Sequence, residues 1–371
     1  MRFLIISHAL HTASDHKLYA YAPYVREMNL WLKYVDNVEI VAPVSRLLPT
    51  KIDLAYQHKS IKLTGIPEIA FTSAKRIIIS LLVLPIIFFK LINACYKADH
   101  IHLRCPGNIG LLGCLVQFLF PLKIKTAKYA GNWDPKALQP KSYRFQKWIL
   151  SNTKLTRNIK VLVYGNWKNQ SKNIKSFFTA TYKDLDKIPF TSKDYSKQLN
   201  FVFVGSLVEG KRPLFAIKLI GLLQKSNINC TLNLFGDGIL KPKLEKYIKH
   251  NNLKGITIHG NQTKDTVQDY LKRSHFTILA SKSEGWPKAL AEAMFFGVIP
   301  IATKISCVPY MLDYGNRGFL IEPDLDQASK LLINEIKNKK RLTEKAELAL
   351  NWSQKYTLDV FEEHIKALVI K

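Results

Sequence analysis

The stretch SKSEGWPKALAEAMFFGVIPIAT, residues 281–303, places two carboxylates around one predicted helix start. Glu284 lies in a turn rich in Ser, Gly and Pro, and Glu292 lies inside the helix that Pro287 is predicted to open at its first position. The unpaired backbone N–H groups of 285–288 and the positive end of the helix dipole suit a phosphate or diphosphate. Two glutamates at this spacing are, taken alone, also typical of a solvated surface.

The whole string resembles the donor-site motif of the retaining glycosyltransferases of family 4, glycosyl transferases group 1, which have the GT-B fold. Glu-Gly-aromatic-Pro, then Glu-Ala-Met, then Gly and a strand-like run follow one another in the order of that motif. The resemblance implies that Glu284 contacts the transferred sugar and that Glu292 holds ribose hydroxyls of the nucleotide. The donor-binding residues that it implies here are Glu284, Gly285, Trp286, Pro287, Lys288 and Glu292.

A glycine-punctuated loop, GSLVEGKRP at 205–213, follows the predicted strand 201–204. Backbone N–H groups and an ammonium suit a diphosphate whose negative charge grows as it leaves. Lys211 matches the family's diphosphate-binding lysine, which makes it a catalytic candidate with Glu284. Ser206 stands where the family usually has arginine, so we expect Arg212 to take that duty; such a loop also occurs on plain surfaces. Gly205, Ser206, Lys211 and Arg212 are therefore predicted to bind the donor.

Two further turns follow predicted strands of the second half. Glycines in Gly236-Asp237-Gly238 allow a ligand to approach the backbone closely, and ligands of open α/β sheets bind at the carboxyl ends of strands. A Gly-Asp-Gly turn alone is weak evidence, and agreement with the family pattern strengthens it. Asn261 follows the next strand, where the family holds the nucleotide base.

The 371 residues exceed what one hydrophobic core usually fills, so two domains are expected. Short β-branched runs alternate with helix-length segments, which predicts an α/β fold with parallel sheets. The resemblance implies GT-B architecture: two Rossmann-like domains whose sheets face a central cleft, and a C-terminal helix that crosses back to the first domain. The predicted domains are 1–185, facing the acceptor and the membrane, 186–350, binding the nucleotide sugar, and 351–371, the returning helices, with a polar linker at 182–198.

The predicted strands fall into two sets of five. Those of the first half are 3–6, 38–41, 100–103, 125–129 and 160–164, and those of the second half are 201–204, 231–235, 256–259, 276–279 and 299–302.

The chain is strongly basic, with 55 Lys and Arg against 28 Asp and Glu and a formal net charge of +27. Between residues 123 and 175, thirteen basic residues and several aromatic residues accompany one acid, Asp134. This mixture suits an anionic membrane surface or a nucleic acid, and it is also found on solvated surfaces of lysine-rich proteins. We expect an anionic membrane as a partner, and no nucleic acid.

Five scattered cysteines without a C-x-x-C pair indicate buried thiols and a reducing compartment. No signal peptide is recognisable at Met1. The apolar runs 77–89 and 109–121 are shorter than the roughly twenty residues of a bilayer-spanning helix. They are expected to pack on the sheet, with exposure to a bilayer interface as the alternative, so the protein is expected in the cytoplasm, at the inner face of the membrane.

The first half is less informative about function. The loop after its first strand, SHALHT, has none of the glycines that the family often carries there. His8, Arg104, Asn132 and Trp133 follow predicted strands and are candidates for acceptor binding. Arg104 suits either a phosphate or a structural ion pair.

Together these features predict a retaining glycosyltransferase that uses a UDP- or GDP-linked sugar and a carbohydrate acceptor, such as a lipid-linked saccharide of bacterial surface polysaccharide synthesis. No cofactor or metal is expected, since the chain has no Asp-x-Asp triplet and no clustered histidines. Three alternatives remain open at this point: a sugar phosphorylase or nucleotide-sugar epimerase of the same fold, a basic nucleic-acid- or membrane-binding protein, and a scaffolding member without catalysis.

Overall fold

Short apolar runs form the strands of two parallel sheets, one in each of two units. The computed structural model describes residues 1–50, 52–70 and 72–370. Unit 1 comprises residues 1–177 and the chain from Glu362 onward, and unit 2 comprises Phe178–Phe361. Unit 2 thus begins before the predicted domain boundary at residue 185. The stretch 182–198, which was predicted as a linker, belongs to unit 2, where the ring of Tyr182 lies 4.8 Å from that of Phe295.

The sheet of unit 1 has the strand order β10-β9-β8-β7-β1-β4-β6, and all neighbouring strands are parallel. The five predicted strands are confirmed, whereas the two edge strands were not predicted. The strands are β1 (Arg2–Ile6), β4 (Asn37–Pro43), β6 (Ile61–Ile66), β7 (His100–Cys105), β8 (Ile124–Tyr129), β9 (Ile159–Tyr164) and β10 (Ile174–Phe177). Unit 1 also has a small antiparallel sheet, which consists of β2 (His11–Ser14), β3 (Lys17–Tyr21) and β5 (Asp53–Ala55). In the sequence, β2 and β3 come between β1 and β4, and β5 comes between β4 and β6.

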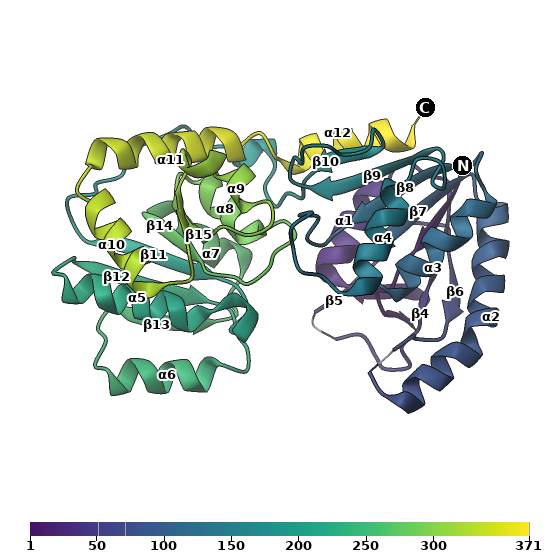
Figure 1. The fold of residues 1–371 in the computed structure, drawn as a ribbon, viewed down its shortest axis with the longest axis horizontal. Coiled ribbons are helices and arrows are strands. Elements are labelled where there is room, and N and C mark those ends of the chain that lie inside the picture. Colours follow the sequence, from purple (N-terminus) through teal and green to yellow (C-terminus); the bar gives the residue numbers. More distant parts are fainter. Residues whose placement is uncertain (51, 71, 371) are drawn as a thin grey trace. The chain divides into compact units, whose positions relative to one another are not determined.

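Helices cover both faces of this sheet (Figure 1). One face carries α2 (Ala74–Lys97), α3 (Asn108–Val116) and α4 (Lys141–Ser151), whose buried residues form one cluster with the strands. The other face carries α1 (Ala22–Leu32), whose Trp31 stacks on Phe3 of β1. Strands covered on both faces read as continuous apolar runs, which is why the central strands were recognisable.

Helix α2 corrects one expectation. The apolar run 77–89 was expected to be too short to cross a membrane, but it lies inside a helix of 24 residues that continues through Pro85. By length and composition alone, α2 is sufficient for a membrane span, and 22% of its apolar window is buried inside the structure.

The sheet of unit 2 has the order β13-β12-β11-β14-β15-β16, again with all strands parallel. The predicted strands are confirmed, and the edge strand β16 was missed. The strands are β11 (Leu199–Val204), β12 (Cys230–Phe235), β13 (Ile256–Gly260), β14 (Phe276–Leu279), β15 (Ile299–Thr303) and β16 (Phe319–Ile321). The helices are α5 (Pro213–Lys225), α6 (Lys241–His250), α7 (Lys264–Arg273), α8 (Lys288–Phe295), α9 (Val308–Met311), α10 (Leu325–Glu335) and α11 (Lys339–Ser353).

The last helix, α12 (Leu358–Val369), starts in unit 2 and ends in unit 1 (Figure 1). Glu362 accepts hydrogen bonds from Lys33 Nζ at 2.7 Å and from Tyr34 Oη at 2.7 Å, at the end of α1. The predicted return of the C-terminal helix to the first domain is thus confirmed. All five cysteines are free and buried, as expected.

Candidate donor site in unit 2 and cavity in unit 1

Two glycine-containing loops lie against each other where β11 and β12 end. The N–H of Gly205 donates to Phe235 O, and the N–H of Leu207 donates to Asp237 O, both at 2.9 Å. A Cβ on Gly236, whose φ is +135°, would lie 2.1 Å from Gly205 O. Only glycine fits there, because any side chain would drive the two loops apart. The predicted motifs 205–213 and 236–238 therefore form one surface.

Lys211 and Glu284, predicted from separate motifs, form an ion pair. Lys211 ends the short 3-10 helix 209–211 after β11, and Glu284 lies in the loop after β14, the neighbouring strand. Lys211 Nζ lies 2.5 Å from Glu284 Oε1, and the two side chains are 32% and 9% exposed. The largely buried carboxylate holds the ammonium at the carboxyl edge of the sheet, where ligands of open α/β sheets bind.

Arg212 connects two of the loops at this edge of the sheet. Its backbone has φ +50°, and its Nη1 donates to the carbonyl oxygen of Ala280 at 3.1 Å. The guanidinium thus joins the loop after β11 to the loop after β14. Ser206, at the position of the family's arginine, is exposed, and its carbonyl accepts from the N–H of Val208.

The loop after β15 forms hydrogen bonds that hold the loop 280–287 in place. Ser306 Oγ accepts from the N–H of Glu284 at 3.2 Å, and Cys307 Sγ donates to Gly285 O at 3.0 Å. Pro287 is the N-cap of α8 rather than its first residue, which corrects the predicted helix start by one position. Trp286 is buried, with its ring 6.0 Å from that of Trp352, so it supports the loop from within.

Glu292 lies one turn into α8, at a small cavity that also involves Lys288, Thr181 and Tyr182. Glu292 Oε1 accepts from Thr181 Oγ1 at 2.7 Å, which fixes the carboxylate at the cavity wall. Thr181 was not predicted, because its role depends on a contact 111 residues along the chain.

Asp237 and Asn261 complete the edge. Asp237 Oδ1 accepts from the N–H of Gly238 at 2.7 Å, and Asp237 Oδ2 lies 3.7 Å from Lys241 Nζ. Asn261 follows β13 and is exposed, and Gly260 before it accepts from the N–H of Gly236. The donor residues predicted after four different strands therefore lie along one edge of the unit 2 sheet.

Unit 1 has a cavity of about 650 Å³ where its own central strands end. His8 after β1 and Arg104 at the end of β7 line it, with Tyr143 of α4. Burial, and then the charge of Arg104, lower the pKa of His8, so the imidazole is neutral at pH 7. Two predicted acceptor residues therefore share one cavity.

A buried acid that the sequence reasoning missed orders this cavity. Glu27 of α1 is paired with the guanidinium of Arg104 and, at 3.0 Å, with Lys128 Nζ. Burial opposes the ionisation of Glu27, but the two cations outweigh it and hold its pKa well below the usual range. Arg104 is thus a structural ion-pair partner, one of the two roles that we considered. A signal was present, since Glu27 continues the buried stripe of Tyr24 and Trp31 on α1.

Trp133 and Asn132 do not line that cavity. Trp133 is a core residue: its Nε1 donates to Gln170 Oε1 at 2.9 Å and Lys147 Nζ lies over its ring. Asn132 Oδ1 accepts from the N–H of Asp134 at 2.9 Å and shapes the turn after β8. Burial of an aromatic ring depends on neighbours from other elements, which the local sequence does not indicate.

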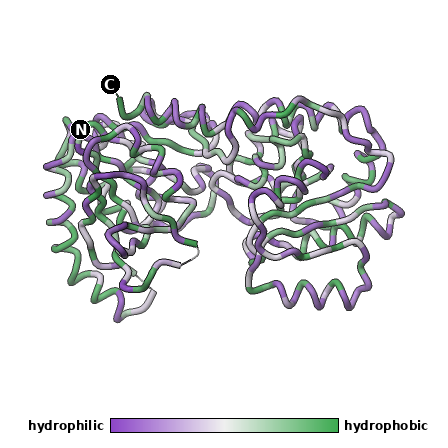
Figure 2. The backbone as a smooth tube through the Cα atoms, turned by 180° about the vertical axis from the view of Figure 1, so that it is seen from behind, coloured by the Kyte–Doolittle hydropathy of each residue, from purple (hydrophilic) through white to green (hydrophobic). Residues whose placement is uncertain are grey.

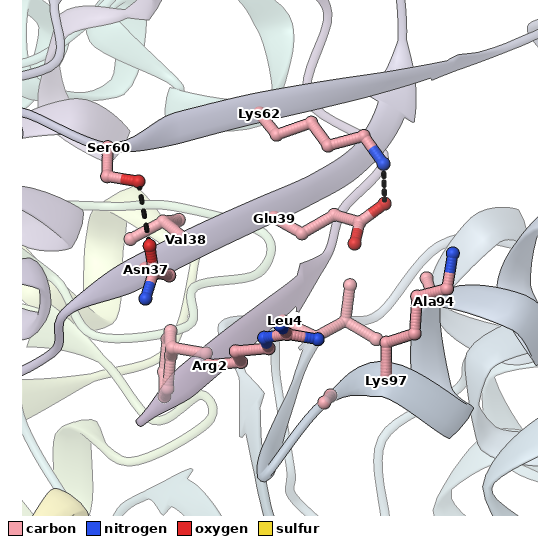
Figure 3. Close-up of a pocket in the computed structure, with 11 residues that line it drawn as sticks. Arg2, Leu4, Asn37, Val38, Glu39, Ser60, Lys62, Ala94 and Lys97 are labelled. Atoms are coloured by element: carbon pink, nitrogen blue, oxygen red, sulfur yellow. Dashed lines mark hydrogen bonds and ion pairs between the residues drawn. The ribbon is translucent and has the colours of Figure 1, made fainter.

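Figure 3 shows a second cavity of unit 1, of about 330 Å³, at the amino ends of β1 and β4. Lys62 Nζ lies 3.4 Å from Glu39 Oε1 there, and Arg2 and Lys97 also line it. It lies at the edge opposite to the one where ligands of parallel sheets bind, so we do not assign it to the substrate site. Within residues 1–50, 52–70 and 72–370, no three His, Cys, Asp or Glu side chains converge as metal ligands.

Solved structures with the same fold identify the architecture. HepE of Anabaena, solved in complex with UDP and glucose, aligns with 99% of this chain and 98% of its own at a TM-score of 0.65 and 13% identity. The likeness shows that the protein has the GT-B fold, as predicted.

The sequence of unit 2 is similar to a known family. Residues 184–355 match the family glycosyl transferases group 1. An uncharacterised glycosyltransferase of Methanocaldococcus jannaschii is 28% identical over 190 residues, 50% of this chain and 52% of that protein. The capsular polysaccharide biosynthesis glycosyltransferase CapH of Staphylococcus aureus is 25% identical over 228 residues, 60% of this chain and 63% of that protein. The chain thus matches between half and two thirds of the length of these relatives.

Proposed function

We propose that the protein transfers a sugar from a nucleoside diphosphate sugar to a carbohydrate acceptor with retention of the anomeric configuration. The observation that carries the proposal is the Lys211–Glu284 pair, 2.5 Å apart, at strand ends where two glycine-containing loops pack against each other. The match of residues 184–355 to the group 1 family and the fold shared with a UDP-binding protein support the same conclusion. A UDP- or GDP-linked sugar is the donor class that we expect.

In this proposal the acceptor hydroxyl attacks the anomeric carbon while the bond from that carbon to the diphosphate oxygen breaks. The electron pair of that bond goes to the diphosphate, which also takes the proton of the attacking hydroxyl. Lys211 and the N–H groups at the start of α8 stabilise the growing negative charge. These groups supply the positive charge, so the mechanism needs no metal ion.

Each carboxylate has a separate role. Glu284 keeps Lys211 in place before the donor binds, and then contacts hydroxyls of the transferred sugar as the diphosphate claims the ammonium. Glu292, oriented by Thr181, holds the ribose with its second oxygen, because a carboxylate accepts two such bonds well.

The acceptor is proposed to bind at the unit 1 cavity that His8 and Arg104 line. The basic excess of the chain and the similarity to a capsular polysaccharide glycosyltransferase favour a lipid-linked saccharide, used at an anionic membrane surface in surface polysaccharide synthesis. Peripheral attachment at the inner face of the cytoplasmic membrane is part of this proposal.

The test is thermal stabilisation by UDP, GDP, ADP, CMP and a short RNA, for the wild type and Glu292→Gln. One nucleoside diphosphate at about 100 times its Kd should stabilise the wild type by about 2.7 kcal/mol. Glu292→Gln should lose most of this effect and still accept the bond from Thr181, whereas Thr181→Val should lose it only in part. If RNA raised the unfolding temperature and none of the nucleotides did, the result would contradict the proposal and favour a basic nucleic-acid-binding protein.

A further inference from the structure

The outer face of α2 is apolar along its length, the reverse of what a helix on a water-exposed face requires. Figure 2 shows α2 as a mostly hydrophobic coil along the outer edge of unit 1. Its large apolar side chains with more than half of their area exposed are Ile78, Leu81, Leu82, Ile86, Phe89 and Tyr96. A continuous apolar patch of this kind marks an interaction surface.

The inner face of the same helix is firmly part of unit 1. Ile87, Leu91 and Cys95 are fully buried in the core, and Lys90 Nζ donates to Gly65 O of β6 at 2.6 Å. A helix that crossed a bilayer would have to take these residues out of the core. The exposed face of α2 can therefore meet a membrane only with the helix lying in the plane of the interface.

Positive charge predominates in the chain segment from α2 to α4. Residues 74–157 contain fourteen Lys and Arg and two acids, and α2 itself has no acid. Lys75 and Arg76 are exposed at its start, and Lys97 at its end lines the cavity of Figure 3 with Arg2.

Helix α4, on the same face of the sheet, adds exposed aromatic rings. Phe145 and Trp148 are stacked with ring centres 5.8 Å apart, and Lys141 and Arg144 of the same helix are exposed beside them. Aromatic rings next to cations are typical of side chains at the level of lipid headgroups.

We propose that the outer face of α2, flanked by these cations and by α4, docks unit 1 onto an anionic lipid bilayer, with α2 in the interface plane. A second copy of the chain fits the face less well, because a two-fold contact between identical patches would set cations against cations. A bilayer with anionic headgroups offers both an apolar layer and negative charge. The proposed function includes attachment to a membrane, and the outer face of α2 is the surface that we assign to this attachment. The biological purpose of the docking therefore rests on the proposed function.

The placement of α2 gives the docking a consequence for the acceptor. Strand β6 leads into α2, so the start of α2 lies at the carboxyl edge of the unit 1 sheet. The acceptor cavity lies at that same edge, and exposed apolar side chains line it: Leu10, Tyr21, Leu47, Leu48 and Ile52. Docking through α2 therefore sets the cavity beside the bilayer, where the apolar part of a lipid-linked acceptor can reach it.

The experiment is flotation of the full-length protein with phosphatidylcholine vesicles, with and without phosphatidylglycerol, at low and high salt. The test variant is Leu82→Glu with Phe89→Glu, whose side chains are 72% and 73% exposed on α2. The matched control is Leu185→Glu with Ile239→Glu, 95% and 83% exposed in unit 2, which changes the charge equally. A second pair of variants compares Lys75→Ser with Arg76→Ser against Lys246→Ser with Lys249→Ser of α6.

We expect the wild type and the unit 2 control to bind phosphatidylglycerol vesicles, with affinity falling as salt rises. The α2 variant should lose about 100-fold or more, because two apolar side chains no longer enter the interface. Loss of Lys75 and Arg76 should cost about five-fold each, and loss of the α6 lysines much less.

Three results would overturn the proposal. The first is equal vesicle binding by the α2 variant and the wild type, and the second is equal binding of the wild type to neutral and anionic vesicles. The third is a wild type that self-associates but does not bind vesicles, with the self-association abolished in the α2 variant. Resistance to alkaline carbonate would overturn the in-plane orientation. Nucleotide stabilisation, measured on the same variants, reports on the proposed transferase activity independently, so the two ideas fail separately.

Discussion

Replacement of Lys211 by Met separates a catalytic role from a structural one. Its ion pair with Glu284 is 2.5 Å long, but the lysine is 32% exposed, so solvent reduces the contribution of the pair to stability. We expect Lys211→Met to lower the free energy of unfolding by about 1 kcal/mol. Loss of a cation at a departing diphosphate should instead raise the barrier to transfer by about 3 kcal/mol, a rate loss of 10²- to 10³-fold. The effect on turnover should therefore exceed the effect on stability.

Lys241→Met is the matched control. Lys241 is also 32% exposed and also paired, with Asp237 at 3.7 Å, at the same edge of the sheet. It should change stability by a similar small amount and leave turnover within a few-fold. Urea unfolding, calorimetric binding of the selected nucleoside diphosphate and release of that nucleotide from its sugar would be measured for both variants.

Glu284→Gln completes the cycle. It frees Lys211 from its carboxylate, so the affinity for the nucleoside diphosphate should hold or rise while turnover falls, because the sugar loses a partner. The reasoning is refuted if Lys211→Met behaves like Lys241→Met in all three measurements, or if Glu284→Gln weakens nucleotide binding as much as Lys211→Met does.

Three further predictions concern stability. Glu27→Gln should cost about 3–5 kcal/mol in chemical unfolding because it leaves two buried cations without their acid, whereas Glu362→Gln at a more exposed pair should cost about 1 kcal/mol or less; equal losses would contradict the assignment. Burial lowers the pKa of His11 to about 4, so the unfolded chain binds a proton on this residue more tightly than the folded chain does. As the pH is lowered from 6.5 to 4, the free energy of unfolding should therefore decrease by about 3 kcal/mol. Urea titrations should show no such decrease for His11→Gln. Gly236→Ala should destabilise unit 2 and weaken nucleotide binding, because its Cβ would lie 2.1 Å from a carbonyl oxygen, while Gly210→Ala, which meets open space, should do neither in the same thermal assay.

The strands that could be predicted from the sequence were mainly those buried in the middle of a sheet. The ten strands predicted were those with apolar runs, and most are central to their sheets. Edge strands such as β6 and β16 have only one neighbour, so their pattern is weaker and they were missed. The length of α2 was also missed, because the expectation rested on the apolar run 77–89 alone, and the helix extends beyond that run at both ends.

The residues of the candidate sites divide in the same way. Lys211, Glu284 and Glu292 were recognisable because each belongs to a local motif whose chemistry and family pattern agree. Thr181 and Glu27 were not, because each acts through a partner distant in the chain. Arg212 carries a charge that suggested ligand binding, and only the contact with Ala280 shows that it joins two loops.

The sequence alone therefore determined the α/β class, the motifs and the basic character, because these depend on residues within a few turns of one another. Only the tertiary structure decided which charges are paired, which aromatic rings are buried and which face of α2 remains exposed. Those properties depend on what other segments bring to the same place, and folding chooses these partners across the whole sequence.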